Sequence, residues 1–332
     1  MFPKGTSERA VLDALLLRGF HKTSFSPFFH SDNGTHAFSW FDAVDYRSHT
    51  GIYAELAQRD GNLSLYVRSR VFASYWDLVE QNELLRQLRS KLKATFQSDY
   101  GGNRYFPLPV RRPEPAESGS ELAFAGFQDA ASRAMAYLGF RQFPASLRAG
   151  TQAELLGSNN PLVLSNNLLL PYLIAILEDY FKSTFIALFR YSPLKETVLK
   201  GARLTGDQLA RISDAHLTVE EAFVETVSFQ NLSAVASHFK SLEPKLDLLG
   251  VLKRPYRRRK RSLLESISAT ISMRHEFIHR GLVVEELSEE AIVAALSDIE
   301  VGVGRFYQKL ADLRVWPVTI SVPRRKAPGG GA

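Results

Sequence analysis

The stretch GIYAELAQRDGNLSLYVRSR, residues 51–70, decides the fold class of the N-terminal part of the chain. Apolar residues alternate with more polar ones from 52 to 56 and again from 63 to 67. Such alternation, with a period of two, predicts strands that are buried on one face. Asp60 and Gly61 lie between the two runs and favour a tight type I′ turn. The stretch therefore predicts an antiparallel hairpin.

The residues on either side of this hairpin extend the pattern. A helix that Ser7 caps and that ends at Gly19 is predicted before it, together with a strand over 36–42. A helix over 76–96 and a strand over 103–108 are predicted after it. Residues 1–110 are thus expected to form an α+β domain with a small antiparallel sheet.

The composition changes at PLPVRRPEPAESGSE, residues 107–121, which is rich in Pro, Ser and charge. A segment of this kind is typical of a connection between domains, and we expect a linker over 111–120. Beyond it the pattern is helical, so residues 121–318 predict an all-α bundle, followed by a flexible tail at 319–332. The expected helices span 121–138, 168–190, 206–212, 219–240, 261–280 and 288–313. The chain as a whole is predicted to be α+β.

Composition limits the classes of function. The 332 residues contain no cysteine, which excludes disulfides, Cys-ligated zinc and a Cys nucleophile. The net charge of +6 favours a polyanionic partner. Neither a signal peptide nor an uninterrupted apolar run of about 18 residues is recognised, so a cytoplasmic protein without membrane contact is expected.

The segment SMRHEFIHRG, residues 272–281, carries the candidate chemistry. It lies at the end of the helix predicted over 261–280, which Gly281 terminates. At about 100° per residue, Arg274 falls within the apolar stripe formed by residues 263–278. A guanidinium there needs a partner. His275 and His279 share a flank, whereas Glu276 falls on the opposite, solvent-facing side.

Two chemistries compete for this segment. Residues 275–279 read H-E-x-x-H, a zinc metallopeptidase pattern in which two His bind the ion and Glu276 activates water. The residues that follow, Arg280 and Gly281, differ from that pattern, and the third ligand would have to be a downstream glutamate. Residues 274–279 also read R-x4-H, a ribonuclease pattern. A second R-x4-H copy, RISDAH at 211–216, is expected to straddle two elements and is set aside.

The sequence RHEFIH in a late helix of an all-helical domain resembles the HEPN superfamily of metal-independent ribonucleases. Many members also carry an apolar-Leu-Glu-x-Tyr run in an earlier long helix, and Leu177, Glu178 and Tyr180 match it. The resemblance covers roughly residues 121–313. It implies an antiparallel homodimer in which Arg274, His279, Glu178 and His275 line a shared cleft.

The resemblance also implies a reaction that needs no metal or cofactor. The ribose 2′-OH attacks the phosphate, a histidine moves protons, and an arginine stabilises the added charge. Similar ribonucleases are often toxins or anti-phage defence effectors, which implies an antitoxin or another regulatory protein as partner. The alternatives are a catalytically inactive nucleic-acid or protein-binding module and the zinc metallopeptidase.

The run KRPYRRRKR, residues 253–261, leads directly into the motif helix. Cations beside a cleft bind phosphates, and an aromatic ring stacks on a base. A run of this kind is also compatible with a solvated loop. The residues expected to contact RNA are Tyr256, Arg257, Arg258, Arg259, Lys260 and Arg261.

Overall fold

The chain has the expected α+β fold, with an N-terminal four-stranded antiparallel sheet and helices followed by a mostly helical region. The computed structural model describes residues 1–23, 36–59, 62–69, 73–140, 161–256, 259–285 and 287–318. The chain divides into two compact units, Met1–Ser118 and Gly119–Ala332. The boundary falls inside the segment that we expected to be a linker. That segment is partly helical, because helix α3 (Pro115–Phe140) begins within it.

The sheet of the N-terminal unit is antiparallel throughout, with strand order β1-β2-β3-β4. Its strands are β1 (His21–Lys22), β2 (His36–Trp40), β3 (Ile52–Arg59) and β4 (Asn62–Ser69). The predicted hairpin is confirmed, since β3 and β4 pair from Ile52–Ser69 to Arg59–Asn62. The expected turn residues, 60 and 61, lie outside the described residues.

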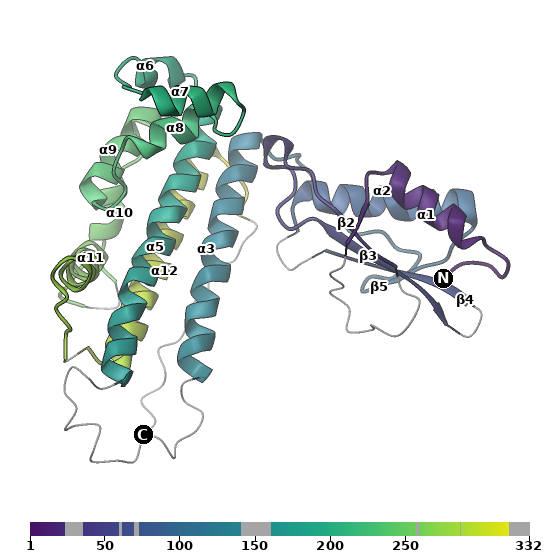
Figure 1. Cartoon of the computed structure of the whole chain (residues 1–332), viewed down its shortest axis with the longest axis horizontal. Coiled ribbons are helices and arrows are strands. Elements are labelled where there is room, and N and C mark those ends of the chain that lie inside the picture. Colours follow the sequence, from purple (N-terminus) through teal and green to yellow (C-terminus); the bar gives the residue numbers. More distant parts are fainter. Residues whose placement is uncertain are drawn as a thin grey trace, which may run out of the picture. The chain divides into compact units, whose positions relative to one another are not determined.

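Two helices cover one face of this sheet (Figure 1). Helix α1 (Glu8–Leu17) begins after Ser7, and α2 (Tyr75–Leu92) begins at a capping box in which Ser74 and Asp77 exchange hydrogen bonds. The core between helices and sheet is apolar, because the alternate residues of each strand point the same way. A 3₁₀ turn (Val44–Tyr46) lies between β2 and β3.

The strand predicted over 103–108 is wrong. Two short strands, β5 (Gln97–Ser98) and β6 (Gly101–Gly102), form a separate hairpin just before it. Within 103–108 the backbone is bound by a side chain, because Asn82 donates to the Phe106 carbonyl at 2.9 Å and accepts from the Phe106 N–H at 2.9 Å. This amide takes the place of a neighbouring strand.

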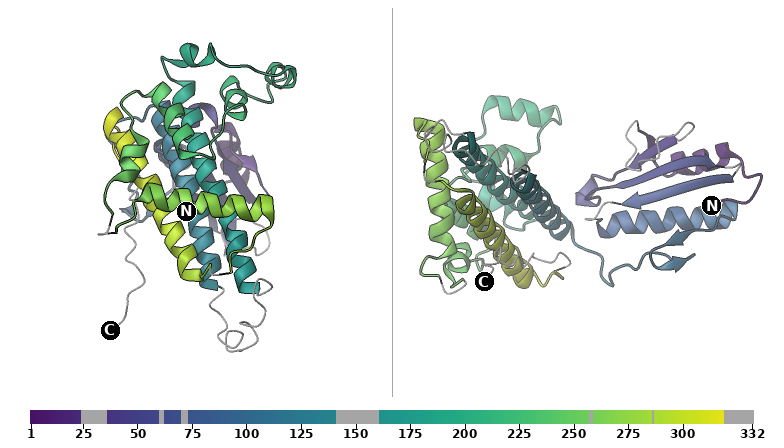
Figure 2. Two further views of the ribbon diagram at one scale, coloured as in Figure 1. Left: turned by 90° about the vertical axis from the view of Figure 1, so that its left-hand side faces the viewer. Right: turned by 90° about the horizontal axis from the view of Figure 1, so that it is seen from below.

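Helices dominate the described part of the C-terminal unit (Figure 1). The long helices α3, α5 (Pro161–Arg190) and α12 (Glu289–Arg314) lie side by side, and α11 (Leu263–Arg280) crosses α5 and α12 (Figure 2). The shorter helices are α6 (Lys195–Leu199), α7 (Gly206–Ser213), α8 (Val219–Glu225), α9 (Leu232–Leu242) and α10 (Leu248–Lys253).

Three differences from the expected helices have local causes. The helix predicted over 219–240 is two helices, because Asn231 caps a new start by accepting from the N–H groups of Ser233 and Ala234. Helices α6 and α10 were not predicted, being too short for a periodic pattern. Helices α7 and α8 each begin at a capping box, formed by Thr205 with Gln208 and by Thr218 with Glu221.

An aromatic core holds the helical unit together. Phe124 stacks on Tyr307 with ring centroids 4.5 Å apart, which joins α3 to α12. Tyr180 of α5 contacts Phe124 and Phe306, and its burial raises the pKa of its phenol well above the usual value. Tyr180, which the HEPN resemblance had drawn attention to, is therefore a core residue whose hydroxyl remains protonated.

Candidate active site

The motif helix α11 is defined by strong signals at both ends. Ser262 and Glu265 form a capping box at its start. Gly281 ends it in the left-handed region with φ +64°, a conformation that costs glycine little. These signals place residues 274–279 in the last two turns of the helix.

Burial changes along α11. The first half is packed, with Leu263, Ile267 and Thr270 buried. The second half, which carries the motif, opens to solvent, since His275 and His279 are exposed. Ile278 was expected on the buried stripe but is 45% exposed, because the helix end extends past the helices that cover its first half. The motif thus lies where a substrate or a partner could reach it.

Arg274 is half-buried, and its Nε atom is buried without a hydrogen-bond partner among the described residues. Glu178 of α5 is in the same condition, with Oε1 buried and unpartnered there. The two helices pack against each other. No ion pair or hydrogen bond links these two side chains within the described ranges, so Glu178 is not the partner that we expected a buried Arg274 to need. Because these two atoms have no partner among the described residues, Arg274 can donate a further hydrogen bond and Glu178 can accept one.

The two motif histidines lie together, with ring centroids 4.4 Å apart and an angle of 48° between the rings. Glu276 is bound elsewhere, since its carboxylate forms an ion pair with Arg280 at 2.9 Å. In the parts of the chain that the structure describes, no three His, Asp or Glu side chains gather as a set of metal ligands. Glu286, one potential third ligand, lies outside those parts. Among the described residues, a zinc ion at this motif would therefore have His275 and His279 as ligands without a third protein ligand beside them.

The segment after α11 is fixed to the start of α5 by two amide side chains. Asn167 donates to the Val284 carbonyl at 3.1 Å and accepts from the Val284 N–H at 3.0 Å. Asn166 donates to the Leu287 carbonyl at 2.7 Å. We call these contacts the amide latch. The latch sets the direction in which the chain leaves the motif helix.

The basic run contains one cation that forms a buried ion pair and others that are exposed. Nη1 of Arg259 lies 2.7 and 2.8 Å from the two carboxylate oxygens of buried Asp298, which also accepts from Ser266 at 2.6 Å. Tyr256 contacts the guanidinium groups of Arg259 and Arg305. Arg259 and Tyr256 therefore have structural contacts here, and their place in our set of expected RNA contacts stays a prediction.

Lys260 and Arg261 are exposed and stay in that set. Arg261 donates to the Glu265 carbonyl at 3.2 Å. Arg257 and Arg258 lie outside the described residues. The sequence analysis does not identify Asp298, although an acidic residue within the apolar pattern of 288–313 indicates a buried carboxylate that needs a partner.

The second R-x4-H copy is not a unit. Arg211 is in α7 and forms an ion pair with Glu225 at 3.3 Å, whereas His216 lies beyond the end of that helix at Ser213. This agrees with our expectation that the copy straddles two elements. It makes His216 a convenient control position.

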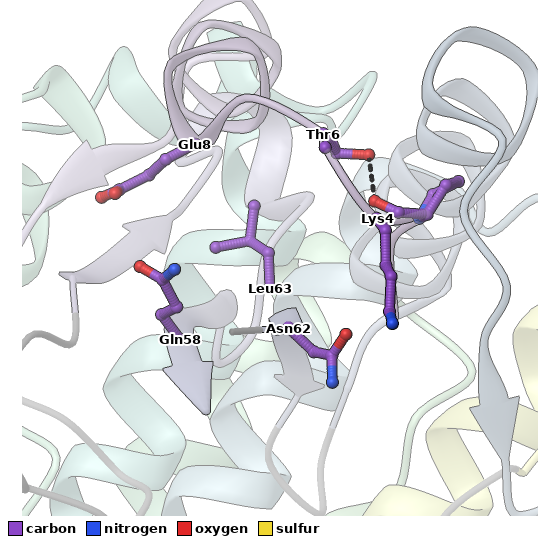
Figure 3. A pocket seen from close by; sticks show the side chains of 8 residues that line it. Lys4, Thr6, Glu8, Gln58, Asn62 and Leu63 are labelled. Carbon is purple, nitrogen blue, oxygen red and sulfur yellow. Dashed lines mark hydrogen bonds between the residues drawn. The ribbon is translucent and has the colours of Figure 1, made fainter. Parts of the chain in front are cut away.

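A small hollow in the N-terminal unit is lined by Lys4, Thr6, Glu8, Gln58 and other residues (Figure 3). Its volume is about 80 Å³, so it holds a few water molecules and no substrate. It belongs to a different unit from α11.

Helix α5 is long and apolar enough to cross a membrane by length and composition, with a mean hydropathy of 1.3 over its best 18-residue window. The core helix of a globular protein passes the same test. Here α5 packs against α8, α9, α11 and α12.

Comparisons of the chain with protein families, with curated proteins and with solved structures find no match. The resemblance to HEPN ribonucleases rests on the motif residues of α5 and α11 and on the chemistry that they can perform.

Proposed function

We propose that the helical unit is a metal-independent endoribonuclease of the HEPN type. The observation that carries this proposal is the pairing of an exposed histidine couple with a half-buried arginine whose Nε lacks a partner among the described residues. An arginine held by its surroundings keeps its fork oriented toward a phosphate. An exposed imidazole within reach of a substrate can act as a general acid or base.

In the proposed reaction the ribose 2′ oxygen attacks phosphorus as His279 accepts the 2′-OH proton. The bond to the 5′ oxygen breaks, and that oxygen receives a proton from the protonated His279, which returns to its neutral form. The products are a 2′,3′-cyclic phosphate and a 5′-hydroxyl. Arg274 stabilises the charge that develops on the non-bridging oxygens. His275 orients His279, and Glu178 supports the position of Arg274.

Two copies of the chain would form the cleft. Residues five positions apart on a helix point about 140° away from each other, so Arg274 and His279 of one copy do not face the same way. A second motif helix packed antiparallel would bring the missing group of each pair. The apolar surface near the motif supports such packing, because Ile278 is 45% exposed, Leu282 is 52% exposed, and Leu164 and Leu168 at the start of α5 are exposed as well.

The biological role follows from the resemblance. We propose a toxin or anti-phage defence effector in the cytoplasm, with RNA as substrate and an antitoxin or regulatory protein as partner. Expression of the intact chain should then arrest growth, and His279→Ala should relieve the arrest.

The central experiment measures RNA cleavage by the full chain and by three matched variants. Arg274→Ala and His279→Ala should each lower the rate at least about 100-fold, in the range typical for loss of a general acid–base or of a charge-stabilising group. His216→Ala is the control, because it removes an exposed histidine from the second R-x4-H copy. Cleavage should persist in EDTA. Normal cleavage by folded Arg274→Ala would refute the mechanism, and loss of activity in EDTA would favour the zinc alternative.

The shared cleft has its own test. The Arg274→Ala protein is mixed with the His279→Ala protein, and the two are allowed to exchange subunits. A mixed dimer holds one intact arginine and one intact histidine, so part of the activity should return. Sedimentation should show a dimer at micromolar concentration, and Ile278→Asp should weaken it. A monomer that cleaves RNA would contradict the composite site.

A further inference from the structure

The N-terminal unit contains two adjoining hollows near the end of α2. One is cationic, about 630 Å³ in volume, and lined by Arg86, Arg89, Lys93 and Tyr105 among others. The other is about 710 Å³ in volume and borders β4, α2 and the segment 95–106, with a mixed lining that includes the rings of Tyr66, Phe96 and Phe106 as well as polar side chains and Asp99. Thr95 and Asn103 line both hollows, so the two adjoin each other. Their size lies within the range typical of small-molecule sites.

The cationic hollow has two side chains without an ion pair among the described residues, although Lys93 Nζ donates to the Ser90 carbonyl at 3.4 Å. Arg89 and Lys93 are exposed and make no ion pair within the described part of the chain. Arg86 is partly neutralised by Glu83, and its guanidinium lies over the Tyr105 ring at 5.0 Å. The helix dipole favours cations at the end of α2. It accounts for one cation there, but not for a hollow between two cations. The pair is suited to one phosphate group.

The aromatic hollow offers a surface for a planar ring. Phe96 and Phe106 line it, and both are half-buried with partners of their own: Phe96 packs on Tyr105 at 5.3 Å and Phe106 on Tyr100 at 5.9 Å. Rings fixed in this way lose little freedom when a base stacks on them.

A buried polar group at the wall of the same hollow has no partner. Gln81 is 2% exposed, and its Oε1 atom receives no hydrogen bond within the residues that the structure describes. Its amide nitrogen makes only a long contact to the Val67 carbonyl at 3.4 Å. A buried acceptor without a donor is costly, and an exocyclic amine of a nucleobase would supply the donor. Asn103 lies where the hollows meet. Its amide oxygen accepts from the Phe96 N–H, and its NH₂ group makes no hydrogen bond within the described residues.

We propose that these joined hollows bind a nucleotide unit, with the base in the aromatic half and the phosphate between Arg89 and Lys93. The unit is either a free nucleotide or one residue of a single strand. The site is contained in the N-terminal unit and does not rest on the proposed ribonuclease activity.

The test uses the full chain and a short fluorescein-labelled single-stranded oligodeoxynucleotide, which has no 2′-OH and so cannot be cleaved by the proposed reaction. Fluorescence anisotropy gives the affinity and its salt dependence. Arg89→Ser/Lys93→Ser should weaken binding at least about tenfold, and it should reduce the salt slope by about 0.7 because one phosphate is no longer neutralised. The charge-matched control is Lys22→Ser/Lys91→Ser, since Lys22 is on the opposite edge strand of the sheet and Lys91 does not line either hollow.

Three competitors identify the ligand. An abasic strand of equal length should bind about tenfold more weakly if a base stacks in the aromatic half. Displacement of the probe by AMP or UMP indicates a free nucleotide, and its persistence indicates a strand. Equal displacement by inorganic phosphate would overturn the base half of the proposal. Equal loss of affinity in the two double variants would overturn the site itself.

Discussion

Arg259→Ala removes a cation with a structural role from a basic run that we propose to contact RNA. Its Nη1 atom is 2.7 and 2.8 Å from the two oxygens of Asp298, whose side chain is 3% exposed. Without Arg259, that carboxylate stays buried with Ser266 as its remaining donor among the described residues. Removing one partner of a buried ion pair costs about 3–5 kcal/mol. Arg259 itself is 36% exposed, so solvent screening lowers our expectation to about 2–3 kcal/mol.

The assay is thermal unfolding of the full chain, followed by circular dichroism. In a unit of this size each 1 kcal/mol lowers Tm by about 2–4 °C, which gives an expected decrease of roughly 4–12 °C. Lys260→Ala is the control, because this neighbouring cation is exposed and such substitutions usually change stability by less than about 0.5 kcal/mol.

A double-mutant cycle then isolates the contact. Arg259→Ala/Asp298→Ala should cost clearly less than the sum of the two single variants, because the second change removes the carboxylate that the first leaves without its partner. A Tm decrease for Arg259→Ala within about 1 °C of that for Lys260→Ala would refute the ion pair. Additive costs in the cycle would refute it as well.

The remaining predictions concern the motif helix, the basic run and the acid range. Gly281→Ala should lower the free energy of unfolding by about 1 kcal/mol, measured by urea titration, because alanine is strained at φ +64°. Lys260→Ser/Arg261→Ser should flatten the salt dependence of RNA binding by up to about 1.4 in slope, and an unchanged slope would mark this run as a solvated loop. Burial raises the pKa of Glu220, but the hydrogen bond and charge of Lys195 outweigh it and leave the pKa lowered. A carboxyl with a lowered pKa stabilises the fold above its unfolded pKa and ceases to do so as the pH falls through the folded value. Lys195→Met should therefore cost about 1 kcal/mol at neutral pH, and the cost should shrink below about pH 4.5; a cost that does not change with pH would contradict the pairing.

Features encoded by local sequence were predictable. The β3–β4 hairpin follows from alternation on both sides of a turn, and α11 follows from an apolar stripe that ends at Gly281. The expected helix, 261–280, differs from the observed one by two residues at its start. Local capping chemistry and periodicity suffice in both cases.

Features that depend on partners far along the chain were not predictable. Within 103–108, the N–H and carbonyl of Phe106 bond to the Asn82 side chain rather than to a neighbouring strand. Arg259 reads as one more cation in a basic run, and its role appears only when Asp298, 39 residues away, is brought beside it. Ile278 has the spacing of a buried residue, yet its exposure depends on how far the neighbouring helices reach.

The amide latch has a consequence for how this chain can change over generations. Val284 offers a backbone N–H and a backbone carbonyl, and Asn167 is matched to both. Aspartate at 167 would be nearly the same size but would replace a donor with an acceptor facing that carbonyl. Because the bonds go to main-chain atoms, the latch tolerates any side chain at 284 that keeps the turn. Asn167 should therefore stay constrained whatever side chain other than proline stands at 284, which is 117 positions away, because proline alone would remove the N–H that Asn167 accepts.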